Sequence, residues 1–196
     1  DAAGAVPLLD FRFGLVTASV TENVPDTVPD SVARHGHRVP LHVLAGDGEA
    51  WSWPYSASRL QQNAAEFRAC GDLFSAALRV EVSQGALAAA THRAYVELVT
   101  SCRAAGYRHL ARIWNHLPEI DGPAGSSAPR DAGYRAFCAG RTAALVELGL
   151  DAAELPAASA LGGAPGTPLV VIVLASRRAV QHIENPRQVS AYRYPA

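Results

Sequence analysis

The 196-residue sequence contains no lysine, no methionine and only three cysteines. Without lysine, Schiff-base chemistry, attachment of pyridoxal phosphate and the Walker phosphate-binding loop are excluded. The cysteines, Cys70, Cys102 and Cys138, are far apart and form no CxxC pair, so we expect free, buried thiols rather than a disulfide framework or a zinc site. Because methionine is absent, we also expect that residue 1 is not where translation starts.

Charge is also scarce. Charged residues make up 18% of the chain, the formal net charge is -1, and the basic residues are scattered arginines, so we expect no nucleic-acid partner. No apolar run approaches the roughly 20 residues of a membrane span, and the first residues do not form a signal peptide. We therefore expect no membrane contact and a cytoplasmic location. The 49% of hydrophobic residues suffices for one domain with its own core.

The pattern of apolar residues predicts strands first and then a helix. The runs 11–20 and 39–45 are typical of short strands between turns rich in proline, aspartate and glycine. Over residues 85–105, apolar side chains recur at spacings of 7, 4 and 4, which predicts an amphipathic helix that ends at Gly106.

The second half of the chain alternates strands with a further helix. A strand is predicted over 107–117, a helix over 131–148, a continuously apolar strand over 168–175 and a short strand over 189–194. Continuous apolar sequence is typical of a central strand that is buried on both faces. Helices between such strands predict an α+β fold, in which helices pack on a mixed β-sheet.

One arginine lies within the apolar face of the helix predicted over 131–148. Six residues share this face at helical spacing: Tyr134, Phe137, Cys138, Arg141, Leu145 and Leu148. A guanidinium group among apolar side chains needs an anion, because it cannot lose its charge. That anion is either a substrate carboxylate, held by two parallel hydrogen bonds, or a structural partner such as Glu81, Glu97 or Asp121.

Two tyrosines near the end of the sequence form a second candidate site. Tyr192 and Tyr194 alternate onto one face of the predicted strand, together with Gln188 and Ser190. Their phenols could hydrogen-bond a carboxylate or a ring hydroxyl in a pocket. The alternative is an edge strand with exposed aromatic side chains.

Histidines offer weaker evidence of chemistry. His35, His37 and His42 are close in sequence, but no acidic residue lies at a ligand spacing from them, so we expect a solvated loop and no metal. His109 and His116 border the predicted strand 107–117, where ordinary hydrogen-bonded histidines are commoner than catalytic ones.

Three segments taken together indicate a known family. They are RHLARIWNHLPEI at 108–120, YRAFCAGR at 134–141 and IENPRQVSAYRYP at 183–195. With LPAASALGG and PLVVIVLA between them, they resemble the N-terminal and middle part of the chorismatase family. The resemblance extends over nearly the whole chain, and it implies that 1–196 is a single domain of this kind.

The resemblance carries expectations about fold and reaction. It implies a fold similar to that of YjgF/Rid and chorismate-mutase-like trimers, with two such α+β units in a full-length chain. The implied reaction is hydrolysis of the enol-ether bond of chorismate, which releases pyruvate and leaves a dihydroxycyclohexadiene carboxylate or a hydroxybenzoate. No metal or organic cofactor is implied.

The resemblance also assigns residues. Arg141 and Tyr134 correspond to residues that hold the substrate carboxylate, and Tyr194 or Tyr192 corresponds to a pocket tyrosine. The family's general acid, a glutamate, belongs to a C-terminal half, as does a second arginine after the YRYP segment. Neither has a counterpart in this sequence. We therefore expect the chain to contribute substrate anchoring, with its catalytic residues unknown.

Three hypotheses about function follow from these expectations. The chain is part of a chorismatase whose C-terminal half is missing from this sequence or is supplied as another chain, or it is a non-catalytic domain that binds a chorismate-like carboxylate or a protein partner. The third hypothesis is a Rid-like homotrimer that acts on a small carboxylate substrate at its subunit clefts.

Overall fold

A computed structural model of the chain describes a large part of it in detail. The described residues are 10–14, 37–40, 50–52, 58–62, 65–118, 120–121, 129, 131–151, 155–163, 166–181, 183 and 187. Their strands are β1 (Asp10–Gly14), β2 (His37–Pro40), β3 (Ala50–Ser52), β4 (Ser58–Gln62), β5 (Ala65–Cys70), β6 (Leu73–Val80), β7 (His109–Pro118), β8 (Ala157–Gly163) and β9 (Leu169–Ser176). The helices are α2 (Leu87–Ala104) and α3 (Ala132–Glu147).

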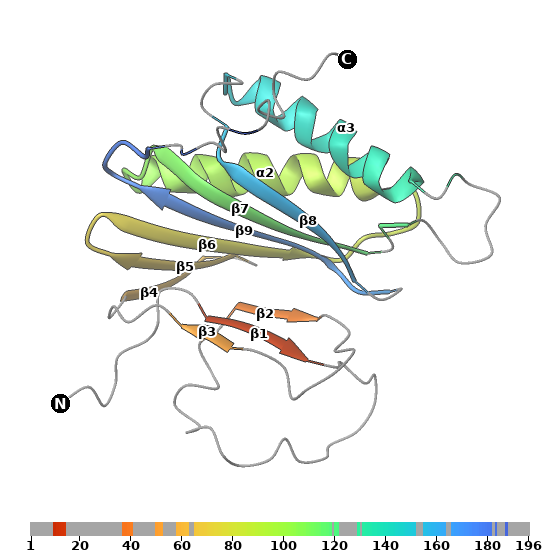
Figure 1. Cartoon of the computed structure of the whole chain (residues 1–196), viewed down its shortest axis with the longest axis horizontal. Helices are drawn as coiled ribbons and strands as arrows, with labels where there is room; N and C mark the ends of the chain where they lie inside the picture. The colour runs from red at the N-terminus through yellow and green to blue at the C-terminus, as the bar shows by residue number, and fades with distance from the viewer. Residues whose placement is uncertain are drawn as a thin grey trace, which may run out of the picture.

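The main element is a six-stranded mixed sheet with both helices on one face (Figure 1). The strand order is β4-β5-β6-β9-β7-β8, where β7 and β8 run parallel and the other neighbours antiparallel. Strand β9 lies inside the sheet, and Leu174 is its one residue that is not fully buried. The predicted α+β fold and the central strand predicted over 168–175 are thus confirmed.

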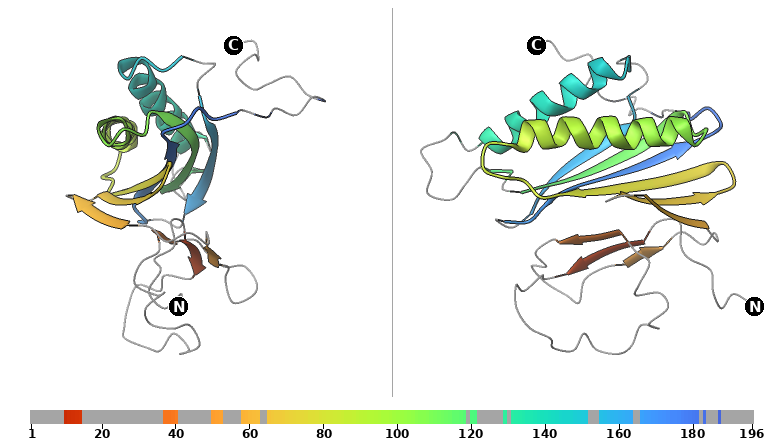
Figure 2. Two further views of the ribbon diagram at one scale, coloured as in Figure 1. Left: turned by 90° about the vertical axis from the view of Figure 1, so that its left-hand side faces the viewer. Right: turned by 180° about the vertical axis from the view of Figure 1, so that it is seen from behind.

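A small second sheet is formed by strands near the N-terminus. Its order is β2-β1-β3, with β1 parallel to β2 and antiparallel to β3. It lies on the side of the main sheet that faces away from the helices (Figure 2). Of the strands predicted over 11–20 and 39–45, only the first part of one and the first two residues of the other fall among the described residues. The strand predicted over 189–194 lies outside them.

Both helices end where the sequence predicts, and for the same physical reason. Gly106 and Gly149 follow them with φ of 87° and 63°, in the left-handed region that other residues adopt with difficulty. After α2, the backbone N–H of Tyr107 donates to the Cys102 carbonyl at 2.9 Å, which satisfies a carbonyl that the helix leaves unpaired. The equivalent bond closes α3.

The two helices touch through a glycine. A methyl group placed on Gly140 of α3 would overlap the backbone carbonyl of Ala88 in α2. The helix backbones therefore approach more closely than a larger residue would allow. This contact holds α3 against α2, and it fixes the position of Arg141, the next residue in α3.

The main core fills the space between the helices and the sheet. Leu98 of α2, Ile113 of β7 and Val171 of β9 belong to it and are at most 1% exposed. A smaller apolar cluster, built around Val170 and Ile172, lies on the opposite face of the sheet. The strands at the centre are thus buried from both sides, which explains their unbroken apolar sequence.

A hairpin and an edge strand have no counterpart among the predicted elements. Strands β5 and β6 join through the two-residue turn Gly71–Asp72, where Gly71 has a φ of 55°. A Gly-Asp pair between two strand-like runs is a signal from which the hairpin could have been predicted. Strand β8, with sequence AASALGG, has little intrinsic strand preference, and its parallel pairing with β7 determines its conformation.

Candidate functional site

The apolar face predicted for α3 is the face that the helix turns inward. Phe137 and Leu145 are buried, and Cys138 and Arg141 are partly buried. Tyr134, in the first turn of α3, is the exception and is 46% exposed. Arg141 therefore lies under α3 among core residues, whereas Tyr134 lies at the surface end of the same face.

A chain of hydrogen bonds lies beside Arg141 in the core. The Tyr95 hydroxyl of α2 donates to Oδ1 of Asn115 in β7 at 2.8 Å, and Nδ2 of Asn115 donates to the carbonyl of Ser159 in β8 at 2.9 Å. Tyr95 and Asn115 are each 1% exposed. These bonds connect α2, β7 and β8; the bond between Tyr95 and Asn115 is buried, and the bond to Ser159 is partly buried.

The charge of Arg141 acts on this chain. Burial raises the pKa of Tyr95 to about 12, while the nearby Arg141 charge and hydrogen bonds with Asn115 and Arg141 act in the opposite direction. Tyr95 is therefore a neutral phenol at physiological pH. Its proton is engaged with Oδ1 of Asn115 at 2.8 Å.

Arg141 has hydrogen-bonding capacity to spare. Its Nε is buried and has no hydrogen-bond partner among the described residues. The ion pairs found in that part of the chain do not include Arg141, so none links it to Glu81, Glu97 or Asp121. A guanidinium group with a free N–H can bind an anion, and a carboxylate matches its planar geometry.

Tyr134 belongs to the same cluster. A hydrogen bond with the Cys138 thiol and the charge of that group raise the pKa of Tyr134, and the Arg141 charge acts in the opposite direction. The Tyr134 ring lies 6.3 Å from that of Phe137, which in turn lies 6.4 Å from that of Tyr95. The structure thus brings Tyr134 and Arg141 together, as the spacing on α3 predicts.

His116 of β7 lies on the opposite face of the sheet. It is 3% exposed, and neither ring nitrogen has a hydrogen-bond partner in the described portion of the chain. Burial lowers the pKa of His116 to about 4, so the ring is neutral at physiological pH. Among the described residues, His116 thus lacks the hydrogen bonds expected of an ordinary buried histidine.

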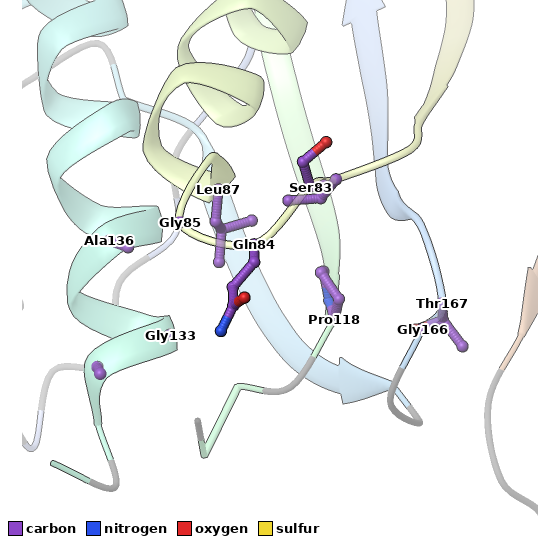
Figure 3. A pocket seen from close by; sticks show the side chains of 11 residues that line it. Ser83, Gln84, Gly85, Leu87, Pro118, Gly133, Ala136, Gly166 and Thr167 are labelled. Carbon is purple, nitrogen blue, oxygen red and sulfur yellow. The ribbon is translucent and has the colours of Figure 1, made fainter. Parts of the chain in front are cut away.

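A cavity of about 500 Å³ lies at the N-terminal ends of both helices (Figure 3). The turn 82–85, Leu87, Pro118, the first turns of α3 and Gly166–Thr167 line it. None of these lining residues is ionisable, and Arg141 and Tyr134 are not among them. The cavity and the cluster around Arg141 are therefore different places.

Some of the other candidate residues lie outside the described residues, and the side chains of two cysteines are described. Tyr192 and Tyr194 lie outside the described residues, as do His35 and His42. Cys102 is a buried free thiol, with its pKa raised to about 12 by burial, and Cys138 is a free thiol that is only partly buried.

Tyr95 and Asn115 were not predicted to belong to the site. Asn115 could have been identified from the sequence, because a polar amide in the apolar run 107–117 needs hydrogen-bond partners when it is buried. Tyr95 was not, since a tyrosine on a helix gives no indication of what its hydroxyl meets. Among the described residues, no helix has the length and apolarity needed to cross a membrane.

The comparisons with known proteins lead to one family. The family described as "Chorismatase FkbO/Hyg5-like, N-terminal" matches residues 49–175. A chorismatase from Streptomyces hygroscopicus is 34% identical over 164 residues, which is 81% of this chain and 46% of that protein. A 3-hydroxybenzoate synthase from the same organism is 31% identical over 147 residues, which is 75% of this chain and 42% of the relative.

A solved structure shares the fold. The crystal structure of a chorismatase superposes with a TM-score of 0.71 at 25% sequence identity, covering 100% of this chain and 56% of the other. The chain thus spans about half the length of the curated relatives it matches. With the family match over residues 49–175 and the shared fold, this chain belongs to the FkbO/Hyg5-like chorismatase family, whose N-terminal part it matches.

Proposed function

We propose that this chain binds chorismate through its carboxylate and supplies the anchoring part of a chorismatase site, with Arg141 as the anchor. The observation that carries the proposal is the buried Nε of Arg141, which has no hydrogen-bond partner among the described residues. A carboxylate that accepts from Nε and a terminal nitrogen would satisfy it with two parallel bonds. Tyr134, at the exposed end of the same helix face, is proposed to add a second hydrogen-bonding group for the carboxylate.

The reaction proposed for the whole protein is hydrolysis of the enol-ether bond of chorismate. Water is added across that bond, pyruvate is released, and the ring leaves as a dihydroxycyclohexadiene carboxylate or a hydroxybenzoate. Protonation of the enol-ether carbon requires a general acid close to it. We assign that acid to a C-terminal half and propose that residues 1–196 form one anchoring domain. Tyr192 or Tyr194 is proposed as a further pocket residue, and the cytoplasm as the location.

Replacement of the anchor tests this function. Arg141→Leu removes a charge that has no carboxylate partner among the described residues, so we expect the free energy of unfolding to stay the same or rise. Chorismate binding, measured by calorimetry, should be lost. Pyruvate release from chorismate, assayed in parallel, reports whether the chain turns over substrate alone.

Arg103→Leu is the matched control. Arg103 is also partly buried, but its Nη1 donates to the Leu148 carbonyl at 2.8 Å, so this variant loses a formed bond, about 1 kcal/mol of stability. It should bind chorismate as the wild type does. If Arg141→Leu instead lost about 3 kcal/mol of stability and kept its binding, Arg141 would be a structural ion-pair partner and the proposed function would fall.

A further inference from the structure

Strand β8 forms one edge of the main sheet (Figure 1). Strand β7 pairs with one side of β8, and among the described residues no strand pairs with the side that faces away from β7. None of the seven residues of β8 is buried, and Leu161 is 44% exposed. An edge strand of this kind presents a row of backbone N–H and C=O groups that can pair with a further strand.

The sequence of β8 has none of the features that usually protect an edge strand. Those features are charged side chains, proline and β-bulges. The strand has the sequence AASALGG, and its pairing with β7 is regular along its whole length. No charged residue occurs between Leu155 and Ser176. Strand β4, at the opposite edge, has the sequence SRLQQ, which contains an arginine. The two edges of the main sheet therefore differ, and β8 is the one without a charge.

The same strand of a second copy of the chain is suited to this edge. Around a twofold axis near Ala160, the middle residue of β8, two copies of the strand would lie antiparallel to each other. Because β8 is uncharged, no like charges meet, and its small alanine and glycine residues leave room for a second backbone. Leu161 of each copy would lie diagonally across from that of the other, so the pairing would remove exposed apolar surface from water.

We propose that two copies of this chain form a dimer through antiparallel pairing of their β8 strands, which joins two six-stranded sheets into one. The assembly closes at two copies, because twofold pairing occupies this edge in both. A second partner also supports a strand whose alanines and glycines have little strand preference of their own. The inference goes beyond the proposed function and is independent of it, since Arg141 lies on α3 and not on this edge.

The mass of the protein in solution tests the dimer, and Leu161→Lys tests the edge. Light scattering and sedimentation across a series of protein concentrations should show a dimer that dissociates to a monomer on dilution. Leu161→Lys places one charge on the edge of each copy, so like charges meet and we expect a monomer throughout. Val146→Lys is the matched control, because it makes the same change of charge at a 75% exposed apolar residue of α3. It should remain a dimer.

Each other result contradicts the inference. A wild-type chain that is monomeric at every concentration would overturn the dimer and leave the edge to a different chain. A trimer would also overturn it, because twofold pairing of one edge closes at two copies. A dimer that survives in Leu161→Lys, or one that is lost equally in Val146→Lys, would show that the contact does not depend on β8. Urea unfolding of each variant checks that it is folded.

Hydrogen exchange of the wild-type chain tests the same edge without any substitution. In a monomer, the amides of β8 that point away from β7 should exchange quickly with water. In the dimer they donate to the second strand, so we expect their exchange to slow by about tenfold at high protein concentration, while that of β4 stays the same. Exchange that does not change in β8, or that slows in β4 instead, would overturn the inference.

Chorismate titration separates this inference from the proposed function. Monomeric Leu161→Lys should bind chorismate as the wild type does, because the substitution leaves α3 and Arg141 unchanged. A missing dimer therefore does not count against the anchoring role of Arg141. Binding that survives in Arg141→Leu would in turn overturn the proposed function and leave the dimer intact.

Discussion

Asn115 and His116 are consecutive residues of β7, and both are almost completely buried, at 1% and 3% exposure. Because they alternate across the sheet, Asn115 points toward the helices and His116 away from them. Asn115 has two hydrogen bonds, one to Tyr95 and one to Ser159. Neither ring nitrogen of His116 has a hydrogen-bond partner in the described residues.

The difference shows two ways in which one strand tolerates a buried polar group. An amide cannot change its charge, so Asn115 needs partners on both sides to offset the loss of water. An imidazole can remain neutral, and burial lowers the pKa of His116 so that it does. The helix-covered face thus carries a hydrogen-bonded polar network, whereas the opposite face carries a buried imidazole that has no hydrogen-bond partner among the described residues.

The largest expected effect is that of Asn115→Leu, which is compared with the same substitution at His116. Asn115→Leu removes two hydrogen bonds and leaves the buried Tyr95 hydroxyl without its Asn115 partner. We therefore expect the free energy of unfolding to fall by about 3 kcal/mol. His116→Leu removes no hydrogen bond found among the described residues, and we expect a change within about 1 kcal/mol at neutral pH. Urea unfolding at neutral pH measures both. Equal losses in the two variants would break the contrast between the two faces.

Lowering the pH should reduce the stability of the fold through His116, on the face of the sheet opposite the helices. In the unfolded chain a histidine titrates near its ordinary pKa of about 6.5, whereas the pKa of His116 in the fold is about 4. Between these values the unfolded chain binds more protons, so stability falls as pH falls through this window and levels off below it. We expect a loss of about 2 kcal/mol between about pH 7 and about pH 5.

The His116→Leu variant isolates that titration from the other ionisable groups. The difference between its unfolding curve and the wild-type curve should show the loss, since the carboxylates are common to both proteins. The residues paired with His116 across the sheet, Leu161 and Val170, carry no charge. A difference that stays constant with pH would mean that His116 is not buried in the neutral form.

The smallest expected effect concerns the helix layer alone. Gly140→Ala places a methyl group against the Ala88 carbonyl, which belongs to the backbone and cannot rotate away, so we expect a loss of about 1 to 2 kcal/mol. Thr142→Ala, at an exposed position of the same helix, should change stability by less than about 0.5 kcal/mol. In Gly140→Ala, the NMR titration of His116 should not move, because the change lies on the other face of the sheet.

Much of the fold follows from local sequence. The helices predicted over 85–105 and 131–148 and the central strand predicted over 168–175 agree with the structure within a few residues, because periodicity and terminal glycines act locally. The hairpin β5–β6 was missed although its Gly-Asp turn is visible in the sequence. Strand β8 could not be predicted from its own residues, since alanine and glycine form strands only when a neighbour provides the pairing.

The candidate site, like the fold, could be predicted from the sequence only in part. The spacing on α3 predicts that Tyr134 and Arg141 share a face, and the structure places them in one cluster with Phe137 and Cys138. The spacing does not show that Tyr95 and Asn115 complete that cluster. Tyr95 precedes Asn115 by 20 residues, and Ser159 follows Asn115 by 44. Contacts at such separations are created by the crossing of helices over the sheet.

The sequence by itself determined the α+β class, the inward face of α3 and the presence on it of an arginine that needs an anion, because each depends on residues within one element. Only the tertiary structure decided that the Nε of Arg141 is buried without a hydrogen-bond partner among the described residues. That outcome depends on how the helices cross the sheet, because α2, β7 and β8 are far apart in sequence and are joined there by the bonds of Tyr95 to Asn115 and of Asn115 to the Ser159 carbonyl.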